Sequence, residues 1–213
     1  MADDRRGNEI ANLILRLWWV VALSMAVGIG ISLVALLVIQ PTYTATATQL
    51  VKGIPGSGAG ANYMAAQFAE SRARSYPTFI GSKSVLDAVR ADLGSTFTDA
   101  ELMERLAASN PEDTPLVKVT ATGRSAKEAQ DLANTATRRL ASFITDIEKV
   151  AGRSPVEVEI AVEAGLPRYA SFPNKTLFVA MGTSVGLALG VVLVLVLRSL
   201  ALGQRTRPVR GAV

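Results

Sequence analysis

The residues of this chain that could do chemistry are mainly carboxylates, because the 213-residue sequence contains neither cysteine nor histidine. These absences exclude a thiol nucleophile, a histidine general base, a disulfide framework and a Cys/His zinc site within the chain. Glu157, Glu159 and Glu163 alternate with apolar residues, a spacing that could attract a cation but is more typical of the solvated face of a strand. Glycoside hydrolysis would need two carboxyls held across a cleft, and neither these glutamates nor Glu112 with Asp113 indicate one.

Two glycine-containing segments lack the full pattern of a phosphate-binding loop. The segment Gly53 to Gly60 (GIPGSGAG) lacks a following Gly-Lys-Ser/Thr, and the run from Gly81 to Ser84 (GSKS) lacks the required upstream glycine. We interpret the first as a flexible connector. Aromatic residues make up only 6% of the chain, so a base-stacking surface for nucleic acid is also poorly supplied. We therefore expect no enzyme, no cofactor, no metal and no nucleic-acid partner.

The apolar residues gather in two uncharged stretches, residues 17–39 and 177–197. As helices, these stretches are each about 30 Å long, which matches the hydrocarbon core of a bilayer. A cleaved signal peptide is the alternative for the first stretch, but the apolar region of a signal peptide usually runs about 7–15 residues. The sequence therefore predicts two transmembrane helices and an uncleaved first anchor in the cell membrane.

The distribution of charge predicts the topology of these spans. Residues 41–175 carry 15 basic and 15 acidic residues, and the N-terminal tail carries three of each sign. The net charge of +4 therefore comes from four C-terminal arginines, which we expect to face anionic lipid or a cytoplasmic kinase: Arg198, Arg205, Arg207 and Arg210. Because basic flanks favour the cytoplasmic side, both termini are predicted inside and the central region outside.

The central region has the alternating and helical patterns of an α+β domain. Residues 43–51 (YTATATQLV), 116–122 and 156–162 alternate as strands do, and pairing of the first with the last would bring the two spans together. Helical patterns cover residues 62–74, then a helix capped by Ser82 and stopped by Gly94, and a helix that opens with Thr98 and Glu101 as a capping box and continues through Leu106.

A second capping box, Ser125 with Glu128, opens the longest soluble helix, at residues 126–150, before Gly152 and Pro155. The predicted fold class is thus an α+β extracytoplasmic domain, with three or so strands and one long helix, between two transmembrane α-helices. The predicted division is a cytoplasmic tail at 1–16, spans at 17–39 and 177–197, the domain at 40–176 and a basic cytoplasmic tail at 198–213.

Small residues recur every fourth position in both spans. Such spacing lets helix backbones approach closely, and in lipid this packing replaces the hydrophobic effect as a source of association. The partner helix could belong to the same chain or to a neighbouring protomer. The residues expected to pack are Ala22, Ala26 and Gly30 in the first span and Gly182, Gly186 and Gly190 in the second.

Three segments resemble those of a known family: YTATATQLV after the first span, LVKVTATGRSAKEAQDLAN, and VEVEIAVEAGLPRYASFPNK before the second span. The chain is similar over nearly its whole length to the chain-length determinant (Wzz-like) family of polysaccharide co-polymerases, in the short form of capsule and exopolysaccharide operons. Ala170 stands where many relatives have a further proline. The most specific motif residues are Ala164, Pro167, Ser171, Pro173 and Asn174.

The resemblance implies a non-catalytic homo-oligomer that acts with a Wzy-type polymerase to set the length of a surface polysaccharide. The tail after Leu197 contains neither a Walker motif nor a tyrosine, so we expect no fused kinase. The resemblance allows a separate tyrosine kinase docked in trans, for which the residues of the tail themselves give no support. Arg138 and Arg139 on the long helix are candidates for a surface that faces another protomer or the growing glycan. The alternative is that this pair simply lies on the solvated face of an amphipathic helix.

Two other functions share this layout of two spans around a domain. An extracytoplasmic sensor would normally continue into a helical linker and an output domain, whereas 16 residues follow Leu197 here. An accessory subunit of an exporter would differ only in its partner, which would be a transport ATPase. We expect the co-polymerase, with the sensor or exporter subunit as the alternative.

Overall fold

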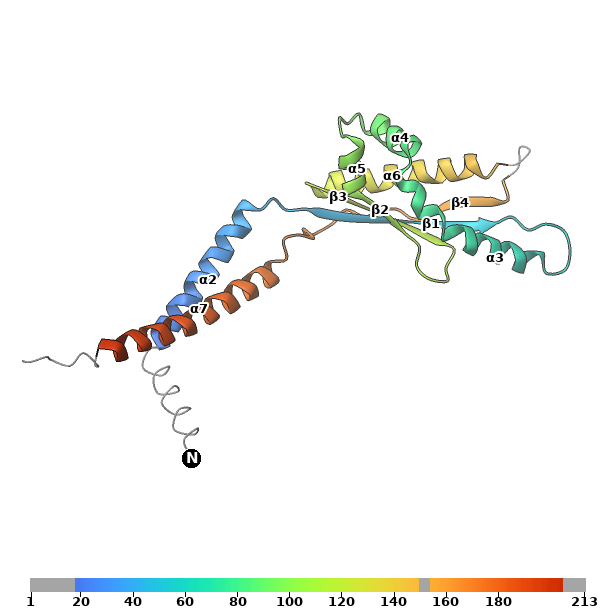
Figure 1. Ribbon diagram of the computed structural model, residues 1–213. Helices are drawn as coiled ribbons and strands as arrows, with labels where there is room; N and C mark the ends of the chain where they lie inside the picture. The colour runs from blue at the N-terminus through green and yellow to red at the C-terminus, as the bar shows by residue number, and fades with distance from the viewer. Residues whose placement is uncertain (1–17, 150–153, 205–213) are drawn as a thin grey trace, which may run out of the picture. The chain divides into compact units, whose positions relative to one another are not determined.

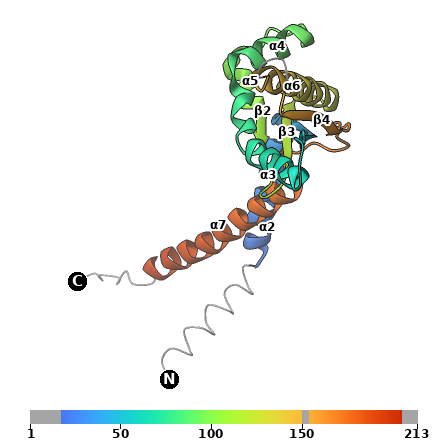
Figure 2. The same ribbon diagram turned by 90° about the vertical axis from the view of Figure 1, so that its right-hand side faces the viewer.

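The computed structural model describes residues 18–149 and 154–204, without the side chains of 198–204. The chain divides into two compact units, one formed by the two terminal segments and one by Pro41–Phe172. The first contains helices α2 (Trp18–Val38) and α7 (Lys175–Gln204). Both are long and apolar enough to cross a membrane by length and composition, over Trp18–Val38 and Lys175–Leu197. They lie side by side in both views (Figures 1 and 2).

The second unit contains an antiparallel sheet of four strands in the order β2-β3-β1-β4. Its strands are β1 (Tyr43–Gly53), β2 (Leu106–Ser109), β3 (Leu116–Gly123) and β4 (Val156–Val162). β1 pairs with β3 along almost its full length, and its far end pairs with β4, with a register irregularity between Thr48 and Gln49. The predicted pairing of the first strand with the last is therefore confirmed.

The long helix α6 (Ala126–Ile147) covers one face of this sheet (Figure 1). Alternate residues of β1 and β3 point toward it and are fully or nearly fully buried, as are the apolar residues along the inner face of α6. This alternation is what a sheet with one covered face requires. Representative core residues are Ala47, Val117, Val119, Leu132, Leu140 and Ile144.

The remaining helices are short and pack around this core. They are α3 (Ala61–Ala73), the 3-10 helix η1 (Tyr76–Gly81), α4 (Lys83–Leu93) and α5 (Asp99–Arg105). Pro77 lies in the first turn of η1, where its missing N–H costs no hydrogen bond. Gly94 ends α4 in the left-handed conformation at φ 57°, which only glycine adopts without strain.

The helix caps agree with the sequence in part. Thr98 and Glu101 form the complete predicted capping box at the start of α5. Ser125 Oγ accepts from the Glu128 backbone N–H at 3.1 Å, whereas the Glu128 carboxylate accepts from the Arg124 N–H rather than from Ser125. Ser82 occupies the N-cap position of α4, but its side chain makes no capping hydrogen bond, so that prediction was wrong.

The strand β2 was missed, because the helical pattern after Thr98 was extended through Leu106. In the structure α5 ends at Arg105, and Leu106 begins a strand of four residues that pairs with β3. Leu106 is buried in the same core as Leu102, so its apolar character reflects tertiary burial rather than continued helix. α6 also ends at Ile147, three residues before the predicted end.

Candidate functional site

Helix α7 turns its glycines toward α2. A Cβ added to Gly182 would lie 2.6 Å from the Gly28 carbonyl oxygen, and one added to Gly186 would lie 2.6 Å from the Ser24 carbonyl oxygen. One added to Gly190 would lie 3.0 Å from Val21 Cα. Only residues without a side chain allow this approach, so the three predicted glycines lie together against α2.

The face of α2 that meets these glycines is formed by Ser24, Gly28 and Ser32. Each serine hydroxyl donates to a carbonyl of its own helix, from Ser24 to Val20 at 2.9 Å and from Ser32 to Gly28 at 3.0 Å. The polar groups are thereby satisfied inside an apolar helix pair. The same spacing of four is present in the sequence as Ser24-x3-Gly28-x3-Ser32, whereas the predicted residues Ala22, Ala26 and Gly30 lie in the neighbouring register.

Ala22, Ala26 and Gly30 lie on the exposed side of α2, away from α7. A Cβ added to Gly30 would meet no atom within 4 Å. The structure therefore does not bring the predicted residues of the first span against those of the second. Their packing role stays a prediction, and it applies to contacts outside this helix pair.

The motif segment before α7 is hydrogen-bonded to the long helix α6 at Ala164, which is 2% exposed. The Ala164 N–H donates to Asn134 Oδ1 at 2.8 Å, and its carbonyl oxygen accepts from Gln130 Nε2 at 3.0 Å and from Asn134 Nδ2 at 3.3 Å. Two amide side chains of α6 thus satisfy both backbone groups of Ala164. These amides were missed because only the fold reveals their partner, 30 residues or more along the chain.

The rest of the motif is held by backbone contacts with the residue before β1. Ser171 N–H donates to the Thr42 carbonyl oxygen at 2.8 Å, and Thr42 N–H donates to the Phe172 carbonyl oxygen at 2.9 Å. Pro167 and Pro173 are half-buried. Asn174 begins α7, with its side-chain oxygen 3.3 Å from the Leu177 N–H, as an N-cap residue does.

The two arginines of α6 differ in their surroundings. Arg139 donates to both carboxylate oxygens of Asp92 on α4, with Nε 2.6 Å from Oδ2. This hydrogen bond lowers the pKa of the Asp92 carboxyl and raises the pKa of Arg139. Arg138 is exposed and donates to Thr135 Oγ1 at 3.2 Å. Arg139 is therefore engaged within the domain, and Arg138 remains the more available candidate for a partner.

Of the four C-terminal arginines, only Arg198 lies among the residues that the structure describes. Arg198 belongs to helix α7, and the structure does not describe its side chain. Arg205, Arg207 and Arg210 lie outside the described residues. Their interaction with lipid or a kinase remains a prediction.

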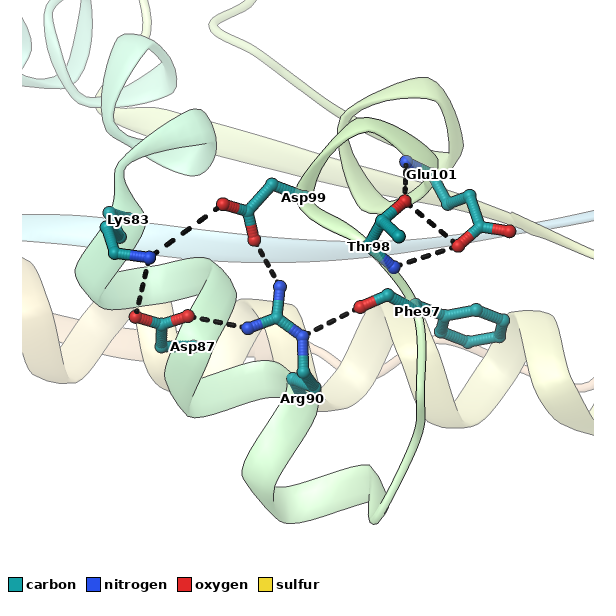
Figure 3. Close-up of polar contacts among 7 residues, drawn as sticks. All are labelled: Lys83, Asp87, Arg90, Phe97, Thr98, Asp99 and Glu101. Atoms are coloured by element: carbon teal, nitrogen blue, oxygen red, sulfur yellow. Dashed lines mark hydrogen bonds and ion pairs between the residues drawn. The ribbon is translucent and has the colours of Figure 1, made fainter.

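A cluster of charged residues joins α4 to the start of α5 (Figure 3). Arg90 donates to the carboxylates of Asp87 and Asp99 and, from Nε, to the Phe97 carbonyl oxygen at 2.7 Å. Lys83 lies 3.5 Å from Asp87 and 3.9 Å from Asp99. The hydrogen bond from Arg90 is the main reason that the pKa of Asp87 is lowered. Each acid faces two cations, so the cluster holds the connection between the two helices.

Two acidic residues named in the sequence patterns, Glu159 and Asp113, have ion-pair partners, as does the nearly buried Glu148. Glu159 pairs with Lys52 across β4 and β1, and Asp113 pairs with Arg74 at 2.9 Å. Glu148, at the end of α6, has a side chain only 7% exposed and pairs with Arg72 at 3.1 Å. Among the described residues, no group of three or more acidic side chains is arranged to hold a metal ion.

No family model matches the chain, whereas comparison with individual proteins finds a similar sequence and a similar structure. The chain is 28% identical over 156 residues to the capsular polysaccharide biosynthesis protein CpsC of Streptococcus pneumoniae. The match covers 73% of this chain, which spans 64% of the length of that relative. A solved full-length bacterial polysaccharide co-polymerase has the same fold, with a TM-score of 0.50 and 12% identity over 90% of this chain and 97% of the other.

Apolar terminal helices flank an α+β domain in this chain, and the similarity in fold extends over both. The chain therefore shares its fold with a solved polysaccharide co-polymerase and part of its sequence with a capsular polysaccharide biosynthesis protein.

Proposed function

We propose that this protein is a membrane-anchored polysaccharide co-polymerase that regulates the chain length of a capsular or extracellular polysaccharide. The observation that carries the proposal is the similarity to a capsular polysaccharide biosynthesis protein, in a chain whose fold matches a solved co-polymerase over 90% of its length. The ion pairs made by its acidic residues favour a scaffold over a catalyst.

In this proposal the chain works as a homo-oligomer with a Wzy-type polymerase. Both termini lie in the cytoplasm, and Pro41–Phe172 lies outside the cell membrane. The exposed row of Ala22, Ala26 and Gly30 then offers a close-packing surface to a neighbouring protomer or to the polymerase. Arg138 is available at the outer face of α6 to a second copy or to the glycan.

The cytoplasmic side of the proposal concerns the basic tail. Arg198, Arg205, Arg207 and Arg210 carry four positive charges without an acid, which suits anionic lipid headgroups. A tyrosine kinase bound in trans is the other proposed partner. Purification of the chain from its own cells, with and without residues 198–213, tests this idea, because loss of a co-purified kinase on truncation would place its docking site in the tail.

The test of the function is the size distribution of surface polysaccharide in cells that carry or lack the gene. Deletion is expected to shorten the product or broaden its distribution, and expression of the intact chain is expected to restore it. A strain with Gly182, Gly186 and Gly190 replaced by leucine, at equal protein level, should resemble the deletion if the helix pair is required. Unchanged polysaccharide in all strains would contradict the proposed function.

A further inference from the structure

A cleft of about 450 Å³ lies between helix α3 and the end of strand β1. This volume is in the range of small-molecule sites, which are about 300–1,000 Å³. Pro115, in the turn before β3, closes one side of the cleft. The lining residues that matter for the argument are Lys52, Asn62, Tyr63, Gln67 and Glu70.

The shape of the cleft depends on Gly53 at the end of β1. A Cβ at this position would lie 2.0 Å from the carbonyl oxygen of Ala65, in the backbone of α3. Helix α3 therefore packs directly on the end of β1, and its residues Ala69 and Ala73 are buried. This close contact turns the neighbouring face of α3, which carries Asn62, Tyr63 and Gln67, toward the cleft.

The side chains in the cleft combine an exposed aromatic ring with free amide groups. Tyr63 is 70% exposed, so its ring is open to contact from solvent. Within the described residues, the side chains of Asn62, Tyr63 and Gln67 have no hydrogen-bond partner in the protein. The carboxamides of Asn62 and Gln67 each offer hydrogen-bond donors and an acceptor.

The charged groups of the cleft are balanced. Lys52 is paired with Glu159, and this hydrogen bond raises the pKa of Lys52. Glu70 is paired with Arg74 at 2.7 Å. A ligand in the cleft thus meets no unpaired charge, which disfavours an anionic ligand such as a phosphate and favours a neutral one that carries many hydroxyl groups.

A pyranose ring has an apolar C–H face and a rim of hydroxyl groups, which match a flat aromatic ring and planar amides respectively. We propose that this cleft binds a short neutral segment of the growing polysaccharide, with one sugar ring stacked on Tyr63 and its hydroxyl groups hydrogen-bonded to Asn62 and Gln67. The identity of the saccharide as the polymer under assembly rests on the proposed function. The binding of a saccharide rests on the cleft.

The inference is tested by binding to the full chain in lipid nanodiscs. The probe is a set of oligosaccharides released by partial hydrolysis of the surface polysaccharide of the producing cells. Tyr63→Ala is expected to weaken binding about fivefold or more, since aromatic packing contributes that much beyond area, and Tyr63→Trp should retain it. Gln67→Ala is expected to weaken it less. The matched control is Tyr169→Ala, a tyrosine that is 83% exposed and outside the cleft, which should bind as the wild type does.

The outcomes separate this inference from the proposed function. If gene deletion changes polysaccharide length but wild-type protein binds none of the oligosaccharides, or Tyr63→Ala and Tyr169→Ala weaken binding equally, the cleft inference is overturned and the function stands. If deletion leaves the polysaccharide unchanged while Tyr63→Ala selectively lowers affinity, the saccharide site stands and the function fails. A change of oligomer size in Tyr63→Ala with unaltered affinity would assign the cleft to a second copy and overturn the inference.

Discussion

At the scale of single residues, Gly186 of α7 and Gly30 of α2 differ in what surrounds them. A Cβ on Gly186 would press on backbone atoms of α2, with Met25 Cα at 3.0 Å, whereas one on Gly30 would meet nothing within 4 Å. Backbone atoms cannot rotate away as a side chain can. The same chemical change at these two positions should therefore have different consequences.

Gly186→Leu is expected to destabilise the helix pair by about 1–3 kcal/mol or more, because the added side chain forces α2 and α7 apart. Gly30→Leu is the matched comparison: because Gly30 faces away from α7, this change should leave the packing of the helix pair within one monomeric chain unchanged. The thermal midpoint of the full chain in detergent micelles measures both. Equal destabilisation by the two variants would mean that α7 does not pack on the Ser24, Gly28 and Ser32 face.

The ion pair of Asp92 with Arg139 makes a pH-dependent contribution to stability. Because Arg139 lowers the pKa of Asp92 in the folded protein, the pair stabilises the fold above the unfolded carboxyl pKa of about 3.9. That stabilisation is lost as the pH falls through the folded pKa. We expect Asp92→Asn to lower the thermal midpoint at pH 7 and to match the wild type near pH 2.

The control for this prediction is Asp146→Asn, whose partner Lys149 lies three residues along the same stretch of chain, with Asp146 Oδ1 2.8 Å from Lys149 Nζ. A local exposed pair of this kind contributes little to stability. A deficit of Asp92→Asn that persists unchanged in acid would show that the carboxylate charge is not its cause.

At the scale of elements, α6 is the helix on which the sheet depends. Its inner face contacts β1, β3 and β4, and Leu140 at its centre has no exposed surface. Leu140→Ala is expected to cost about 2–5 kcal/mol through lost burial and a cavity. Leu166→Ala, at a leucine that is 57% exposed, should change stability by less than about 0.5 kcal/mol. Thermal unfolding of the two variants side by side checks the difference.

The elements also show how far local patterns carry a prediction of the fold. The strands at β1, β3 and β4, the capping box at Thr98 and the glycine stop at Gly94 were predicted because each depends on neighbours within a few residues. β2 was not predicted, since four residues that continue a helical pattern became a strand by pairing with β3. Its conformation is decided by partner residues nine or more positions away in the sequence.

At the scale of the whole molecule, the segment before α7 is tied to the domain by α6. Asn134 serves both backbone groups of Ala164, while Gln130 adds a bond to the carbonyl alone. Removal of Asn134 leaves a buried N–H without a partner, at a cost of about 1–3 kcal/mol. The effect should therefore spread along the motif segment rather than stay at one residue.

Asn134→Leu is expected to increase hydrogen exchange throughout residues 163–172 and, under the proposed function, to broaden the polysaccharide size distribution. Gln130→Leu is the matched control, since the Asn134 side chain still serves Ala164 in that variant, and its exchange should rise less. Equal exchange in both variants and in the wild type would show that α6 does not hold this segment.

The sequence by itself determined the two apolar spans, the order of most elements, the small-residue spacing and the family resemblance, because these depend on composition, periodicity and contiguous motifs. Tertiary structure alone decided which face of α2 meets α7. Residues 22, 26 and 30 and residues 24, 28 and 32 have the same spacing, and periodicity shows which residues share a face but not what that face touches. Tertiary structure also paired Arg139 with Asp92 and brought Tyr63 and Lys52 to the lining of one cleft. Contacts of this kind between distant segments exist only once the chain has folded.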